Sequence, residues 1–191
     1  MQKCNICPLK GVFMYRLKVK EQNNNEKSEL FIEMYDRHAD HIYRFVLLKV
    51  SNKDLAWDIT QECFLKVWQY HKDSDSGIKN YRAFIFSIAR NLIIDYWRRK
   101  DKTATIDLEE VAFALEDAGN LHEETSIKHE TLELMEFINQ LPEHQKEILL
   151  LRYVEDLPFS EIAKIIGKSA VSARVEAHRA VKKIKKLTKN E

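Results

Sequence analysis

Apolar residues return at three- and four-residue intervals along most of this chain, and strict alternation of apolar and polar residues is hard to find. Such spacing places apolar side chains on one face of a helix rather than on one face of a strand. The pattern predicts an all-α protein. The segments with helical spacing are 28–50, 54–70, 81–100, 132–141, 142–154, 161–166 and 170–187.

Residues that begin or end helices lie where this pattern changes. Ser28, Asn80, Ser160 and Ser169 each precede an apolar-periodic segment, where a side-chain oxygen can cap the first turn. Gly167 gives the backbone the freedom for a tight turn before the last helix. A short capped helix, a glycine turn and a longer helix are the layout of a helix-turn-helix.

Charge divides the chain into blocks, although the net charge is only +1. Residues 103–127 contain seven acidic residues and no basic residue. We therefore predict two small helical domains, 28–102 and 128–191, joined by an acidic linker at 103–127, with the helix-turn-helix in the second. Residues 1–27 have no sustained period and are predicted to form a tail without regular structure.

The last predicted helix has one small-residue apolar side and one basic side. Ala173, Ala177 and Ala180 lie on the first side, and from Arg174 to Lys189 there are seven basic residues. A solvated amphipathic helix end is one interpretation of such a run. The preceding glycine turn favours the other, in which the helix reads bases near its start and its lysines hold DNA phosphates.

Two helices in the first half carry more apolar or basic surface than one core contact needs. On helix 54–70 the apolar arc covers about half of the circumference, which indicates either burial from two sides or a partner. On helix 81–100, Arg90 lies between Phe86 and Trp97, and three basic residues close the helix. The three basic residues at the end of this helix suit the negative end of the helix dipole. Aromatic and basic residues on one face can also stack bases and hold phosphates.

Other chemistry finds little support in the sequence. Cys4 and Cys7 form a C-x-x-C pair, but no second pair or zinc-spaced cluster accompanies them. No catalytic constellation or glycine-rich phosphate loop is present in the sequence, so we predict no enzyme, metal or cofactor. No apolar run approaches the length of a membrane span, and the start lacks a signal-peptide core, which predicts a cytoplasmic location.

Several stretches resemble segments of RNA polymerase sigma factors. Residues 141–152 and 156–163, followed by Ser169 and His178-Arg179-Ala180, look like sigma domain four. Residues 58–68 resemble the polymerase-binding helix of domain two, and 81–99 resemble its −10-reading helix. Their order and spacing are similar to those of an extracytoplasmic-function (ECF) sigma factor. A stand-alone helix-turn-helix regulator, the alternative, would need neither of the two upstream helices.

The resemblance implies that the chain directs core RNA polymerase to promoter DNA. Docking would use the β′ clamp helices and the β flap of the polymerase, and no cofactor is implied. An anti-sigma factor is implied as a further partner, and in this family it is often membrane-bound. The residues implied in polymerase binding are Asp58, Gln61, Glu62, Phe64 and Trp68.

The resemblance also implies two DNA contacts, with the 71–79 loop and the helix after it capturing an unstacked base. Glu176 departs from the family pattern, because many members carry a basic residue there. The residues implied for the −10 element are Asn80, Tyr81, Arg82, Arg90, Asn91, Asp95, Trp97, Arg98 and Arg99. Those implied for the −35 element are Ser169, Val171, Ser172, Arg174, Val175, His178, Arg179 and Lys182.

Overall fold

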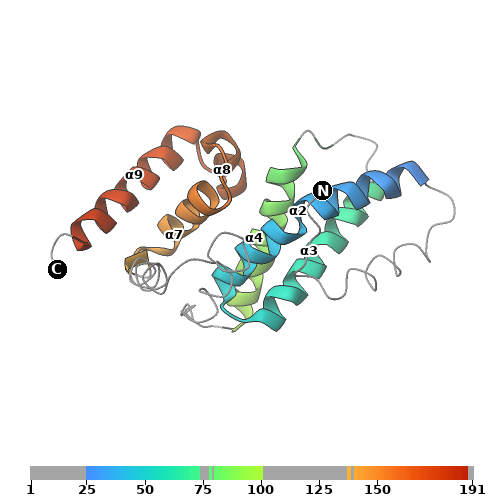
Figure 1. Cartoon of the computed structure of the whole chain (residues 1–191), viewed down its shortest axis with the longest axis horizontal. Coiled ribbons are helices and arrows are strands. Elements are labelled where there is room, and N and C mark those ends of the chain that lie inside the picture. The colour runs from blue at the N-terminus through green and yellow to red at the C-terminus, as the bar shows by residue number, and fades with distance from the viewer. Residues whose placement is uncertain (1–24, 74–77, 79, 101–136, 139, 189–191) are drawn as a thin grey trace, which may run out of the picture.

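The structure is a computed structural model that describes residues 25–73, 78, 80–100, 137–138 and 140–188. Every regular element in these ranges is helical, which confirms the all-α prediction. Three long helices form an N-terminal unit, and three helices with a π-helical turn form a C-terminal unit (Figure 1). The N-terminal unit comprises α2 (Asn25–Val50), α3 (Lys53–Asp73) and α4 (Tyr81–Lys100); the C-terminal unit comprises α7 (Glu143–Leu149), η2 (Leu150–Val154), α8 (Phe159–Ile166) and α9 (Ala170–Leu187).

Polar side chains fix the starts of three helices. Asn52 Oδ1 accepts a hydrogen bond from Leu55 N at 2.8 Å, and Asn80 Oδ1 accepts one from Ala83 N at 2.9 Å. Ser169 Oγ accepts from Ser172 N at 3.1 Å. The predicted caps at Asn80 and Ser169 are therefore confirmed, and each satisfies a backbone donor that the first turn leaves open.

The connection before α8 differs from the prediction. The helix begins at Phe159 with Pro158 as its cap residue, so Ser160 lies inside the first turn and the predicted cap at Ser160 is wrong. Proline suits this position because it cannot continue a preceding helix and already has a compatible φ. The predicted helix 142–154 is also not uniform, since α7 ends at Leu149 and a π-helical turn follows. In the N-terminal unit, the predicted loop 71–79 also starts later than predicted, because α3 runs on to Asp73.

The core of the N-terminal unit is built by aromatic pairs between helices. The ring centroids of Tyr35 and Phe64 lie 4.6 Å apart, and those of Phe45 and Phe86 lie 5.3 Å apart. All four side chains are buried, and each contributes about 1.5–3 kcal/mol by leaving water. Cys63 is buried beside them, where burial raises the pKa of its thiol far above the ordinary value. Its predicted packing role is confirmed.

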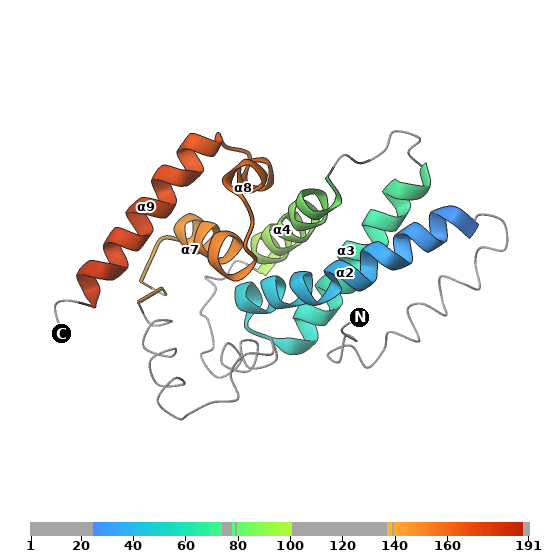
Figure 2. The ribbon, with the colours of Figure 1, turned by 45° about the horizontal axis from the view of Figure 1, so that its top comes forward.

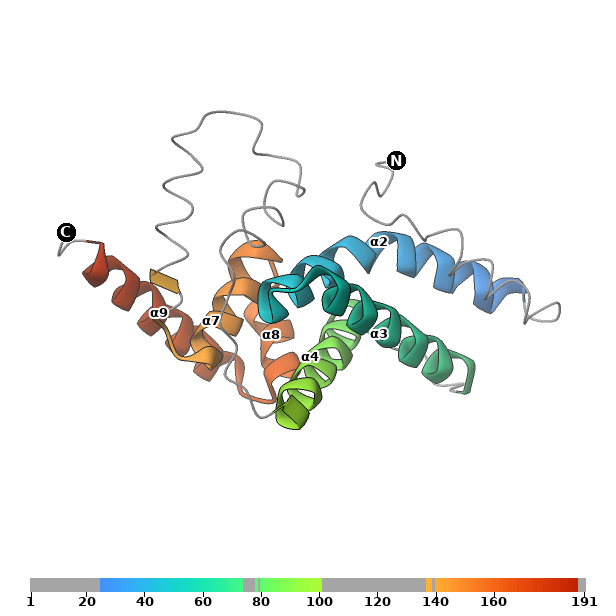
Figure 3. The same ribbon diagram turned by 90° about the horizontal axis from the view of Figure 1, so that it is seen from below.

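The two units pack against each other. Helix α4 contacts α8, and Figure 2 shows α7 lying between α9 and α4. Buried residues of η2 and α8, including Leu151, Leu157 and Ile162, belong to the same apolar cluster as the core of the N-terminal unit. Seen from below, α9 lies on the far side of the C-terminal unit from α3 (Figure 3). The predicted acidic linker, residues 1–24 of the predicted tail and most of the predicted helix 132–141 lie outside the described residues. Residues 25–27 are already helical, because α2 begins at Asn25, so the predicted cap at Ser28 is wrong.

Candidate functional site

Helix α9 presents a mixed basic and apolar face to solvent. Ala173, Ala177 and Ala180 are buried, and their small side chains allow α9 to lie close to its neighbours. Gly167 makes the turn before it with φ of 68°, a left-handed conformation that favours glycine. Val171 is 68% exposed and Val175 is 43% exposed, although both are apolar. The remaining exposed members of this face among the predicted residues are Ser169, Arg174, His178, Arg179 and Lys182.

Phe159, the first residue of α8, orients two arginines. The guanidinium carbon of Arg152 lies 5.4 Å from the ring centroid of Phe159, and that of Arg174 lies 5.5 Å from it. Both distances are those of cation–π contacts. Arg174 is thereby held beside α8, at the start of α9. Sequence reasoning missed Phe159, because its role depends on two residues distant from it in the chain.

Glu176 lies on the inner side of α9 rather than on its outward face. Its side chain is only 15% exposed. It accepts hydrogen bonds from Gln145 Nε2 at 3.1 Å and Arg179 Nη1 at 2.8 Å, and His144 Nε2 lies 3.3 Å away. The bond from Gln145, aided by Arg179 and His144, lowers the pKa of Glu176. The acid that breaks the family pattern therefore connects α7 to α9.

The helix predicted to bind polymerase exposes only part of the predicted set. Asp58 and Glu62 are exposed, and Gln61 is half-buried. Phe64 is fully buried, so it supports the helix from within the core and is not on its surface. Trp68 is half-buried, with its ring centroid 4.8 Å from that of Phe31. The wide apolar arc thus reflects burial against both α2 and α4.

The start of α4 lies beside a small cavity of about 180 Å³. Tyr81 and His71 line it, and Tyr81 Oη lies 2.9 Å from His71 Nδ1. Burial raises the pKa of Tyr81. His38 lines the same cavity, and its pKa falls to about 4, because of its burial first and then the charges of His41, Arg82 and Arg37. Asn80 precedes Tyr81 in the chain, and its side-chain oxygen serves the helix cap.

The far half of α4 leaves four of the predicted DNA-contacting residues exposed, namely Asn91, Asp95, Arg98 and Arg99. Arg98 Nη1 lies 3.4 Å from Asp95 Oδ1, and Arg99 Nε donates to the Asp95 carbonyl at 3.2 Å. Trp97 is half-buried, with its ring centroid 5.1 Å from that of Tyr96. These contacts gather basic and aromatic groups at one end of the helix.

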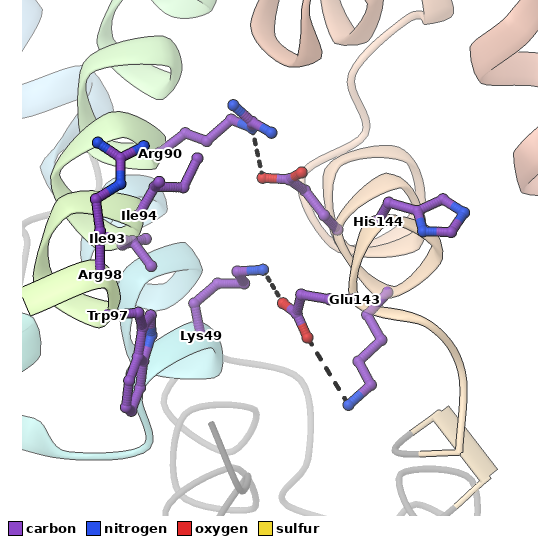
Figure 4. Close-up of a pocket in the computed structure, with 10 residues that line it drawn as sticks. Lys49, Arg90, Ile93, Ile94, Trp97, Arg98, Glu143 and His144 are labelled. Atoms are coloured by element: carbon purple, nitrogen blue, oxygen red, sulfur yellow. Dashed lines mark hydrogen bonds and ion pairs between the residues drawn. The ribbon is translucent and has the colours of Figure 1, made fainter. Parts of the chain in front are cut away.

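Two of the predicted DNA contacts instead face the C-terminal unit. Arg90 Nε donates to Glu147 Oε1 at 2.9 Å, and Arg82 donates to the backbone carbonyl of Glu155. Beside Arg90 a cleft of about 700 Å³ separates α4 from α7. Figure 4 shows Lys49 and Arg90 reaching across it, with Lys49 bound to Glu143. The other residues that line it are Ile93, Ile94, Trp97, Arg98, His144, Lys146 and Glu147.

The described residues contain no group of three or more His, Cys, Asp or Glu side chains placed to hold a metal ion. No helix within the described ranges is both long enough and apolar enough to cross a membrane.

Comparison with known proteins matches two family models in the same order along the chain. Residues 34–103 match sigma-70 region 2, and residues 131–184 match sigma-70 region 4. Together they cover the helices of both units. Two matching models leave no reason to favour a stand-alone helix-turn-helix regulator.

Individual relatives of the chain are also sigma factors. The chain is 29% identical over 157 residues to the ECF RNA polymerase sigma factor SigM of Bacillus subtilis, covering 81% of this chain and 93% of that one. It is 26% identical over 177 residues to the ECF sigma factor BldN of Streptomyces coelicolor, covering 90% of this chain and 65% of the relative. In fold it is similar to the sigma factor RpoE of Bartonella quintana, which was solved with the anti-sigma factor NepR. The TM-score is 0.64 at 19% identity, and the match covers 83% of this chain and 96% of that one.

The two units and their order therefore define a sigma-70-type transcription initiation factor. Within that class, the chain belongs to the ECF sigma factors, and its function is that of an alternative sigma factor.

Proposed function

We propose that this sigma factor docks on core RNA polymerase through the exposed acids of α3 and reads two promoter elements with α4 and α9. The observation that carries the proposal is the outward face of α9. There Val171, Arg174, Val175 and Arg179 follow a capped helix start and a left-handed glycine turn. Such a helix fits the major groove, where its first residues meet base edges and its later lysines meet phosphates.

For the −10 element, the proposal uses the exposed end of α4. Asn91, Arg98 and Arg99 are exposed there, with Trp97 beside them. Tyr81 and the cavity at the other end of the helix would receive an unstacked base. Unstacking costs a few kcal/mol per step, which aromatic stacking and phosphate contacts can offset.

The partners follow from the same surfaces. Asp58 and Glu62 would meet the β′ clamp helices, and the C-terminal unit would meet the β flap. An anti-sigma factor is proposed as a further partner, supported by the neighbouring structure in which a sigma factor is bound to one. We place the protein in the cytoplasm and assign it a non-catalytic role, in keeping with its family.

In vitro transcription tests the proposal, using purified core polymerase and genomic fragments from the source organism. We expect transcripts from a small set of promoters only when this chain is added. Asp58→Ala with Glu62→Ala should abolish binding to core polymerase and all transcripts, because it removes exposed charges without disturbing the core. A matched control is Glu29→Ala on α2, an exposed acid on another helix. Transcription that is independent of the chain, or unaffected by the double variant, would contradict the proposal.

A further inference from the structure

The contact between the two units has acids on one side and bases on the other. Glu143 pairs with Lys49, Glu147 with Arg90, and Glu155 with Arg44. The acids come from α7 and from the residue that follows η2, whereas the bases come from α2 and α4. Three basic residues of the N-terminal unit are therefore each paired with a carboxylate of the C-terminal unit. The N-terminal unit is the one that we propose binds the −10 element.

Glu155 is the most completely enclosed of these acids. Its side chain has no exposed surface. Arg44 donates to both carboxylate oxygens, from Nε to Oε1 at 2.9 Å and from Nη2 to Oε2 at 3.1 Å. His41 Nδ1 lies 2.7 Å from Oε2, and Arg82 donates to the backbone carbonyl of the same residue. Two helices thus converge on one residue, α2 on its carboxylate and α4 on its backbone carbonyl.

These groups form a site suited to an anion, independent of the residue that fills it. A guanidinium that donates two parallel hydrogen bonds matches a phosphate as well as it matches a carboxylate. While the units are packed, the Arg44 side chain is only 17% exposed, so its charge needs an acceptor there. Once Glu155 leaves, the positive charge of Arg44 and Arg82 remains.

The position of this site indicates which anion would replace the carboxylate. Arg82 and Arg90 are both on α4 and lie about 12 Å apart along the helix axis, at 1.5 Å per residue. Each contacts a glutamate of the C-terminal unit, one through a backbone carbonyl and one through a carboxylate. A nucleic-acid strand is a regular series of anions that can meet both arginines at once, whereas a single small anion cannot.

We propose that His41, Arg44 and Arg82 form a phosphodiester-binding site, which Glu155 fills while the two units are packed together and a DNA backbone phosphate fills when they separate. Arg44 and His41 thereby join the DNA-binding surface of the N-terminal unit. This inference rests on the proposed contact of α4 with the −10 strand. In the packed form the site is closed, so only the fraction of molecules with separated units can use it.

The test measures the affinity of the full chain for a fluorescein-labelled single-stranded oligonucleotide by fluorescence anisotropy at low salt. We expect Glu155→Gln and Glu155→Ala to bind the oligonucleotide at least about fivefold more tightly, because the closed fraction falls. The gain should be smaller in Glu155→Gln/Arg44→Ala, because the units still separate but Arg44 no longer holds a phosphate. That double variant should also reduce the slope of log affinity against log salt by about one relative to Glu155→Gln.

The matched control is Asp156→Asn, which removes the same charge from the adjacent residue. The Asp156 side chain is 91% exposed, and asparagine tolerates its positive φ of 47°. Its affinity should stay within twofold of the unchanged chain. A gain in Asp156→Asn equal to that in Glu155→Gln would reduce the effect to net charge and overturn the site. A gain in Glu155→Gln/Arg44→Ala as large as that in Glu155→Gln, or no gain in either Glu155 variant, would overturn it as well.

Arg99→Ala separates this inference from the proposed function, because Arg99 lies on the exposed end of α4, outside the contact between the units. If Arg99→Ala weakens binding while the Glu155 variants change nothing, the proposed −10 surface stands and the Arg44 site is overturned. If neither the Arg99→Ala substitution nor the Arg44→Ala substitution changes the affinity, both the proposed role of α4 in DNA binding and the Arg44 site fail.

Discussion

Arg174 and Arg179 are both exposed bases on α9, yet they have different neighbours, and we propose different roles for them. Arg174 stacks on Phe159 near the helix start, where side chains reach base edges. Arg179 forms an ion pair with Glu176 at 2.8 Å, one turn further along. A residue held by an aromatic ring has few rotamers to lose on binding, which suits base recognition. A residue paired with an acid keeps only part of its charge for a phosphate.

At the residue scale, Arg174→Ala should cost about 1–3 kcal/mol in affinity for the −35 duplex of a promoter that the chain uses, and should relax preference at one base pair. Arg179→Ala should weaken binding to all duplexes about equally. Phe159→Leu keeps both arginines, and is expected to relax base preference with a smaller loss of affinity. Anisotropy with a series of single-base-pair changes measures all three. Unchanged base preference in both Arg174→Ala and Phe159→Leu would refute the assignment.

At the scale of elements, the turn between α8 and α9 sets the angle of the helix-turn-helix. Gly167 adopts φ of 68°, and a Cβ added there would meet no atom within 4 Å. The glycine is therefore needed for its backbone conformation and not for lack of space. Ser169 then starts α9 by capping its first turn. The two residues together decide where α9 begins and which way its outward face points.

Gly167→Ala should lower the free energy of unfolding by about 1–2 kcal/mol, because an L-residue is strained in the left-handed region. Ser169→Ala should cost about 1 kcal/mol through loss of the cap. Urea denaturation followed by circular dichroism measures both. The control is Lys168→Ala, an exposed residue between them, for which we expect a change within about 0.5 kcal/mol. Equal stability of Gly167→Ala and the control would show that backbone strain at the turn does not matter.

For the whole molecule, the packing of the two units decides which DNA-contacting residues are available. Arg90 is paired with Glu147, and the side chains are 25% and 8% exposed. The outward face of α9, by contrast, stays open to solvent. The packed chain therefore presents its proposed −35 surface while part of the proposed −10 surface is covered. Separation of the units is expected before both elements can be read.

Charge reversal at this contact tests that arrangement. Arg90→Glu places two acids together in a poorly hydrated site, where loss of a buried pair costs about 3–5 kcal/mol. We expect the units to separate and the radius of gyration measured by small-angle X-ray scattering to rise. The exchange Arg90→Glu/Glu147→Arg restores opposite charges and should restore the compact form. A chain that stays equally compact in the single variant would show that the Arg90–Glu147 pair is not needed to hold the units together.

Local patterns in the sequence predict the helices and the turn at Gly167, because spacing, capping side chains and the low content of glycine and proline act within a few residues. The set of residues expected to meet DNA comes mainly from the resemblance to sigma factors. The sequence also identified Cys63 as a core residue, because the apolar stripe of its helix includes that position. The start of α8 was misassigned to Ser160, because Pro158 competes as a helix start and local pattern does not rank the two.

The tertiary structure alone decided which of those residues are free. The resemblance to sigma factors implies that Phe64 contacts the polymerase, yet Phe64 packs on Tyr35 in the core. Glu176 interrupts a run of basic residues in the sequence, yet it joins α9 to α7. Glu155 reaches Arg44 across 111 residues of chain, a contact that no local pattern encodes. Burial and ion pairing depend on which surfaces meet, and that is settled only when separate helices pack.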